Sequence, residues 1–190
     1  MMDHVRPTVL LLTTTVITGL IGTAPSAHAD DPSPLYRLVD TAAQRLQTAE
    51  PVSAFKWVKG GPIEDPPRSK QVVDSAGADA TKQGIDPQPV RAIFTDQVHA
   101  TEGIEYTRFG QWKLDPTVAP TNAPDLSASR AAIDGFNHQM VTEMALHWDS
   151  LRGPACGQLR DDALRAVIAD RQLEPLYQQA LTFATHSYCT

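Results

Sequence analysis

The sequence lacks the common catalytic signatures. It contains no Gly-x-Ser-x-Gly nucleophile elbow, no His-Glu-x-x-His zinc motif, no phosphate-binding glycine loop and no Cys-x-x-Cys pair. The six histidines show no metal-ligand spacing. We therefore expect no metal site, and we expect His99, His138, His147 and His186 to be surface or packing residues.

Positive charge is also scarce. The chain has 16 lysines and arginines against 22 aspartates and glutamates, and its formal net charge is −6. An acidic chain without a basic run is a poor candidate for nucleic-acid binding. After residue 29 no segment is apolar enough to cross a membrane. We expect neither a nucleic acid nor a membrane as a partner of the mature protein.

The N-terminal segment has the pattern of a cleaved signal peptide. Residues 8–22 carry no charge, yet this run is shorter than the roughly 20 apolar residues that span a bilayer. Ala27-His28-Ala29 follows, which is the small-x-small pattern that a signal peptidase reads. We predict a signal peptide over residues 1–29, cleavage between Ala29 and Asp30, and a secreted or periplasmic protein. The alternative is a membrane anchor that is never cut.

The mature part, residues 30–190, has the length of one domain with a real core. Both cysteines, Cys156 and Cys189, lie in it. In an oxidising compartment an even pair predicts one disulfide bond. Two buried free thiols are the alternative.

Helical periodicity dominates the mature part. Apolar residues recur at three- and four-residue steps, while the period-2 alternation of strands is almost absent. A first helix is expected at about 34–59, kinked or divided by Pro51. Its apolar side consists of Leu35, Leu38, Val39, Ala42, Leu46 and Ala49. Further helices are expected at about 66–83, 87–112, 127–152, 156–170 and 173–188, with a proline-rich loop at 113–124.

Signals for helix ends flank these segments. Ser33, Asp65 and Asp86 each precede a proline, which is the order of a capping residue and a first-turn proline. Asp125 offers another helix start, and Gly84 and Gly153 lie where helix C-termini are expected. The fold class is therefore all-α, a single-domain bundle of about six helices. The cysteines fall near opposite ends of the last two helices, so a disulfide would staple a C-terminal helical hairpin.

Charged residues interrupt the apolar faces of these helices. Arg45 lies beside Leu46, and Lys56 lies between Phe55 and Trp57. A cation flanked by aromatic residues can be a partly desolvated ligand for an anion. It can equally be a side chain that extends its charge into solvent.

The third helix carries a carboxyl group on an apolar stripe. Phe94, Val98, Thr101 and Glu105 are separated by four, three and four residues, which places them on one face. Glu105 should therefore be paired or have its pKa raised by desolvation. A buried bridge between Glu105 and an arginine is the structural alternative.

Two more arginines open helices. Arg68 follows Asp65 by three residues, and Arg130 precedes Asp134 by four, as in an i,i+4 ion pair. Together with Arg45 and Lys56 they make four cations from different helical segments, able to face one interior beside a hydroxyl and a carboxyl group. Such a set suits a small dianion, and it offers no obvious nucleophile or base for hydrolysis.

The order of these motifs resembles one family. Ala42-Ala43-Gln44-Arg45-Leu46, Pro51-Val-Ser-Ala-Phe55-Lys56-Trp57, Pro62-Ile-Glu-Asp65-Pro-Pro-Arg68, Ala100-Thr101-Glu102-Gly-Ile-Glu105-Tyr106 and Asp125-Leu-Ser-Ala-Ser-Arg130 together resemble the secreted, all-helical chorismate mutases, the gamma class of the AroQ type. The likeness covers essentially the whole mature chain, and the two C-terminal cysteines also fit it.

The resemblance implies an isomerase that converts chorismate to prephenate by an intramolecular Claisen rearrangement, without a cofactor. It implies that Arg45 and Arg130 clamp the substrate carboxylates, and that Lys56 reaches a carboxylate and the ether oxygen. Arg68 would help to hold the anion, Asp65 would lie near the ring hydroxyl, and Thr101 would bond a carboxylate. Glu105 would face the ether oxygen, where an ionised carboxylate would be repulsive, so we expect it to react protonated.

The sequence departs from the family at the second helix. Some all-helical mutases carry a glutamate directly after the second-helix arginine, where this chain has Ser69. Val72 stands where the secreted class can carry a glutamine, and it can contribute packing and backbone groups alone. The contact to the ring hydroxyl is therefore the least defined, and Glu102 is a further candidate for it.

The family also commonly forms homodimers, and its secreted class builds each site within one chain, so a homodimer is expected here. Two other functions fit the same residues. An exported helical bundle can bind a small dicarboxylate without catalysis, and the Arg–Glu pairs can merely join helices in a protein that acts through a protein partner.

Overall fold

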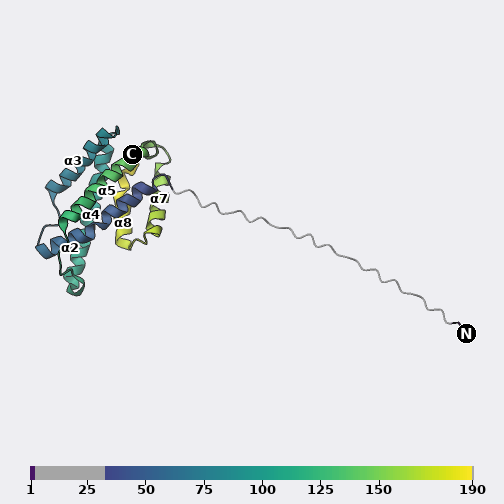
Figure 1. The fold of residues 1–190 in the computed structure, drawn as a ribbon, viewed down its shortest axis with the longest axis horizontal. Coiled ribbons are helices and arrows are strands. Elements are labelled where there is room, and N and C mark those ends of the chain that lie inside the picture. The colour runs from purple at the N-terminus through teal and green to yellow at the C-terminus, as the bar shows by residue number, and fades with distance from the viewer. Residues whose placement is uncertain (3–32, 190) are drawn as a thin grey trace. The chain divides into compact units, whose positions relative to one another are not determined.

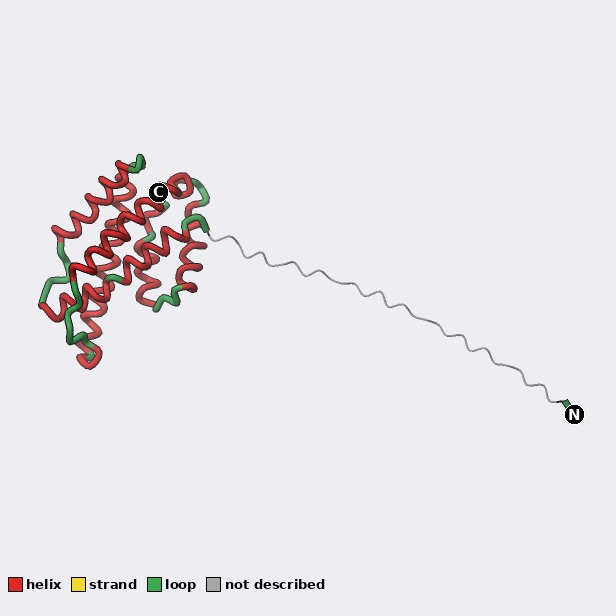
Figure 2. The backbone as a smooth tube through the Cα atoms, viewed as in Figure 1, coloured by secondary structure: helices red, strands yellow, loops and turns green. Residues whose placement is uncertain are grey.

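The computed structural model describes residues 1–2 and 33–189. The predicted signal peptide, apart from Met1 and Met2, and its cleavage site lie outside the described residues. Figure 2 shows helices joined by short loops, with no strand in the described part of the chain. The all-α prediction is confirmed. The elements are α1 (Tyr36–Gln47), α2 (Ala49–Lys59), α3 (Pro66–Lys82), α4 (Pro87–Leu114), η1 (Pro116–Val118), α5 (Leu126–Leu146), α6 (Trp148–Arg152), α7 (Cys156–Asp170), α8 (Pro175–Ala184) and η2 (His186–Tyr188).

The described residues thus hold eight α-helices where about six were expected. The first expected helix is divided into α1 and α2 at Thr48, three residues before Pro51. Proline has no N–H to donate to the carbonyl four residues back, at Gln47, which is where α1 ends. Pro51 itself lies in the first turn of α2, where a missing N–H costs nothing.

The helix at 127–152 is divided as well. His147 departs from helical dihedrals with φ −115° and ψ 24°, and it separates α5 from α6. The N–H of His147 still donates to the oxygen of Glu143, and Leu151 donates to His147. The two helices therefore follow each other with the hydrogen-bond ladder largely kept, which is why periodicity alone predicts one helix.

Local capping signals place the starts of α3, α4 and α5. The carboxylates of Asp65, Asp86 and Asp125 accept hydrogen bonds from backbone N–H groups in the first turns of α3, α4 and α5, as N-cap residues do. Gly84 takes a left-handed φ of 79° just after α3, which glycine adopts without strain. Ser33 lies just before α1, which begins at Tyr36 with Leu35 at its N-cap position, and the Ser33 hydroxyl accepts from the N–H of Leu35 at 3.2 Å.

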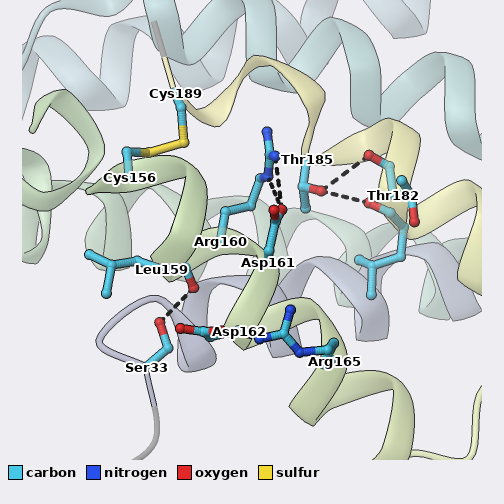
Figure 3. Close-up of polar contacts among 11 residues, drawn as sticks. Ser33, Cys156, Leu159, Arg160, Asp161, Asp162, Arg165, Thr182, Thr185 and Cys189 are labelled. Atoms are coloured by element: carbon cyan, nitrogen blue, oxygen red, sulfur yellow. Dashed lines mark hydrogen bonds and ion pairs between the residues drawn. A yellow bond between two sulfur atoms is a disulfide. The ribbon is translucent and has the colours of Figure 1, made fainter. Parts of the chain in front are cut away.

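The C-terminal helices are closed by the predicted disulfide. Cys156 opens α7, and its sulfur is bonded to that of Cys189, with the two Cα atoms 5.6 Å apart (Figure 3). The same close-up shows the hydroxyl of Ser33 donating to the backbone oxygen of Leu159 at 2.7 Å. The start of the domain and its end are therefore both fastened to α7.

Helix packing creates one main core. α4 packs against α2, α3 and α8, while α1 packs against α5 and α7. Figure 1 shows α3 along one edge of the bundle, where it packs against both α4 and α5. The apolar stripe predicted for the first helix is fully buried, from Leu35 to Ala49. No helix among residues 33–189 is both long and apolar enough to cross a membrane.

Candidate active site

A cavity of about 110 Å³ lies among helices α1 to α5. All the residues proposed for the site from the sequence line it, namely Arg45, Lys56, Asp65, Arg68, Val72, Thr101, Glu105 and Arg130. They come from five different helices and one helix start, so the bundle brings together groups that are far apart in the sequence. The remaining lining residues are Thr48, Val52, Ile63, Ser69, Val98, Glu102, Leu126 and Ile133.

Arg45 forms the buried end of this cavity. It continues the apolar stripe of α1 and is only 4% exposed. Its Nε donates to Oδ1 of Asn137 on α5 at 2.7 Å, and its Nη1 donates to Oγ1 of Thr101 on α4 at 3.2 Å. Nη1 also lies 3.4 Å from the backbone and side-chain oxygens of Gln97. All of these acceptors are neutral.

Lys56 and Glu105 form a close pair across the cavity. Nζ of Lys56 on α2 lies 2.7 Å from Oε2 of Glu105 on α4, and the Glu105 side chain is 3% exposed. Nζ also donates to the backbone oxygen of Ile63, in the loop between α2 and α3. The predicted pairing of Glu105 is therefore confirmed. Its partner is a lysine, so the alternative of a bridge to an arginine is wrong.

Burial dominates the protonation of Glu105. Desolvation raises its pKa from 4.5 to about 7, against the opposing charge and hydrogen bond of Lys56. The negative charge of Glu102, on the same helix, adds to the increase in the pKa. The expectation of a raised pKa follows from the apolar stripe of α4, because a carboxylate there loses its hydration. Near neutral pH this group is able to hold a proton and donate it in a hydrogen bond.

The cations at the open side pair differently from the sequence-based expectation. Asp134 was expected to bond Arg130 one turn away, but its Oδ1 lies 2.7 Å from Nη2 of Arg68 on α3. Arg130 instead lies 3.9 Å from Oδ2 of Asp65, with half of its side chain exposed. Helix spacing makes the i,i+4 pair possible, yet α3 packs against α5 and offers Asp134 a closer guanidinium.

Further polar and apolar side chains line the cavity beside the charged ones. The hydroxyl of Thr101 donates to the backbone oxygen of Gln97 at 2.8 Å, so its lone pairs face Arg45 and the cavity. Val72 is 6% exposed and supplies an apolar wall. Glu102 and Ser69 also line the cavity, which keeps both in reach of a ligand there.

Sequence reasoning missed two groups that hold the site together. Asn137 on α5 and Gln97 on α4 both bond Arg45, and Gln97 is fully buried. The position of Gln97 was predictable from the sequence, because a residue four positions before Thr101 lies on the same helix face. Asn137 carries no comparable signal, since its partner lies 92 residues away on another helix.

The chemistry available is that of an anion site with one carboxyl group whose raised pKa leaves it partly protonated near neutral pH. Four cations surround the cavity, and Arg45 among them is buried with no carboxylate bonded to it among residues 33–189. Within residues 33–189, no three histidine, cysteine, aspartate or glutamate side chains are grouped as metal ligands would be. The arrangement is suited to holding a small dianion and donating hydrogen bonds to it.

Comparison with known proteins agrees with this arrangement. Residues 36–106 match the family model described as chorismate mutase type II. The chain is 51% identical to the secreted chorismate mutase of Mycolicibacterium smegmatis over 94% of this chain and 99% of the relative. It is 47% identical to the secreted chorismate mutase of Mycobacterium tuberculosis over 97% of this chain and 96% of the relative.

Solved structures agree as well. A chorismate mutase from Burkholderia phymatum superimposes with a TM-score of 0.79 at 26% identity, covering 84% of this chain and 98% of that one. A chorismate mutase from Burkholderia thailandensis gives a TM-score of 0.77 at 28% identity, over 83% of this chain and 99% of that one. From its near full-length likeness to the two mycobacterial relatives, the chain belongs to the chorismate mutase type II family.

Proposed function

We propose that this protein is an exported chorismate mutase that binds chorismate in the cavity among α1 to α5 and converts it to prephenate. The observation that carries the proposal is that Arg45, buried and bonded only to neutral acceptors among the described residues, shares one cavity with the Lys56–Glu105 pair. Chorismate is a dianion with an ether oxygen between its two halves. The cavity offers separate cations for its carboxylates and two donors for that oxygen.

The rearrangement makes modest demands on the protein. A pericyclic reaction needs no nucleophile and no proton transfer, but it needs the flexible substrate held in its reactive shape. It also needs donors aimed at the ether oxygen, which gains negative charge as its C–O bond breaks. An acceleration of about 10⁶-fold corresponds to only about 8 kcal/mol of differential stabilisation. A few preorganised cations around the substrate suffice for that.

The position of each side chain supports the role that we propose for it. Arg45, with Nη2 making no hydrogen bond to the described protein residues, binds one carboxylate from the buried end, helped by the Thr101 hydroxyl. Arg130 and Arg68 bind the other carboxylate at the open side, and their long side chains allow them to close over the substrate. Asp65, Ser69 and Glu102 are the candidates for the ring hydroxyl, while Val72 packs against the ring.

Lys56 and Glu105 act on the ether oxygen. In the free protein Nζ of Lys56 bonds Glu105 at 2.7 Å. A bound carboxylate competes for Lys56 and brings further negative charge close to Glu105, which favours its protonated form. Protonated Glu105 and Lys56 then both donate toward the oxygen as its charge develops.

Export and assembly complete the proposal. The relatives from two mycobacteria are named secreted chorismate mutases, and residues 1–29 have the pattern of a signal peptide. We place cleavage between Ala29 and Asp30, with the mature domain at 30–190 in the periplasm or outside the cell. We further expect a homodimer with each cavity built by one chain, which light scattering on the purified protein tests.

The decisive test separates catalysis from binding. Purified, disulfide-intact protein is mixed with chorismate, and the loss of chorismate absorbance and the formation of prephenate are followed. Conversion well above the spontaneous rate supports the proposal. An increased melting temperature with chorismate left intact would contradict it and favour the dicarboxylate-binding module instead.

A further inference from the structure

The charge of Arg45 is unusual for a buried group. Buried arginines are normally paired with a carboxylate, because an isolated charge loses its hydration without compensation. Arg45 takes part in no ion pair among the described residues. Burial lowers the pKa of Arg45 to about 10, and the nearby charge of Arg68 acts in the same direction.

Neutral oxygens nevertheless hold the guanidinium firmly. Arginine has no acceptor, so each partner must present an oxygen. Asn137 presents Oδ1 to Nε at 2.7 Å, and Thr101 and Gln97 present oxygens to Nη1 at 3.2 and 3.4 Å. Asp134 also acts on Arg45, but its Oδ1 already accepts from Arg68 at 2.7 Å.

Gln97 gives independent support. Its side chain is fully buried, and its Nε2 has no hydrogen-bond partner among the described residues. An orphaned buried donor is costly. A glutamate of the same size would remove that orphaned donor and would also neutralise Arg45. The chain instead holds an amide there, so no carboxylate in the described part of the chain bonds the guanidinium of Arg45.

We infer that Asn137 and Gln97 are positioning residues that fix Arg45 through neutral acceptors and so reserve its positive charge for a carboxylate of the substrate. This inference rests on the proposed function for the identity of that substrate. The amides set the direction of the guanidinium, and their lack of charge sets how strongly it attracts an anion. A carboxylate at either position would keep the geometry and supply a resident counter-ion that competes with the substrate.

The test uses isosteric changes of charge. Asn137→Asp and Gln97→Glu are compared with Asn122→Asp, which makes the same change at the chain's other asparagine, on the exposed loop before α5. For each purified, disulfide-intact protein the melting temperature without ligand and the KM and kcat for chorismate are measured. Asn137→Ala, which removes the acceptor altogether, shows the effect of lost positioning.

Both carboxylate variants are expected to raise KM about tenfold or more with a much smaller change in kcat. The reason is that they weaken the attraction between Arg45 and a substrate carboxylate, which is equally present in the bound substrate and in the transition state. Asn137→Asp should melt no lower than wild type, since it gives the buried cation a partner, whereas Asn137→Ala should melt lower. Asn122→Asp should leave KM, kcat and the melting temperature unchanged. A KM within about twofold of wild type in both carboxylate variants overturns the inference.

The two proposals fail in different ways. If wild-type protein leaves chorismate intact, the proposed function fails. The inference is then measured by calorimetry, as the affinity of each protein for chorismate. Weaker binding by Asn137→Asp and Gln97→Glu than by wild type supports it, and equal binding overturns it.

Discussion

Glu105 is the residue whose proton should control the rate of the proposed reaction. It lies on the apolar stripe of α4 and is 2% exposed, so its ionised form is poorly hydrated. Its carboxyl group would face an oxygen that gains negative charge during the rearrangement. A bound proton turns repulsion at that place into a hydrogen bond.

The pH dependence of the reaction follows from this proton. Desolvation places the pKa of Glu105 at about 7, so the protonated form predominates below that pH and is lost as pH rises. We expect kcat/KM to fall about tenfold per pH unit above pH 7, and Glu105→Gln, which cannot ionise, to flatten the profile. An unchanged profile in the Gln variant would show that another group controls the rate.

At the scale of the element, the loop between α2 and α3 holds the amino group of Lys56 through a backbone oxygen. Gly60 ends α2 with a left-handed φ of 75°, and the chain then turns so that the oxygen of Ile63 accepts from Lys56. Any side chain is strained at that φ, whatever space surrounds it. The turn therefore depends on glycine at this position.

Gly60→Ala is expected to destabilise the protein by about 1 kcal/mol and to weaken the hydrogen bond from Lys56 to the backbone oxygen of Ile63. Gly110→Ala is the matched control, since Gly110 lies exposed inside α4 and a methyl group added there would meet open space. Alanine there should stabilise by about 0.5–1 kcal/mol. Urea unfolding measures both changes, and a loss of stability in Gly110→Ala equal to that in Gly60→Ala would contradict the conformational argument.

Elements and single-helix faces were predictable where the signal is local. Asp65, Asp86 and Asp125 cap helices as their sequence context indicates, and the four-residue step from Thr101 to Glu105 places both on the cavity. Pairings between helices were not predictable in this way. Asp134 bonds Arg68 rather than Arg130 because of how α3 packs against α5, which no spacing within α5 encodes.

At the scale of the whole molecule, the disulfide fastens the C-terminal end to the start of α7. Cys156 and Cys189 are 33 residues apart, and Tyr188 beside Cys189 is only 2% exposed. The disulfide lowers the conformational entropy of the unfolded chain more than that of the folded chain. The expected stabilisation therefore depends on the length of the closed loop.

The double variant Cys156→Ser, Cys189→Ser should lose about 3–4 kcal/mol of stability in urea unfolding. Wild-type protein unfolded in the presence of a reductant provides the control and should lose a similar amount. Equal stability of the oxidised wild type and the double variant would contradict this expectation. It would mean that the disulfide adds no stability beyond that of the packing of α7 and α8.

The central claim is that preorganised cations and Glu105 convert chorismate in this cavity. The most direct measurement is the rate of prephenate formation by the purified, oxidised protein beside Arg130→Ala and Lys56→Met. The account predicts rapid conversion by the wild type and a loss of about 10²-fold or more in each variant. A folded wild type that leaves chorismate unconverted, or variants that convert it as fast as wild type, would contradict the account.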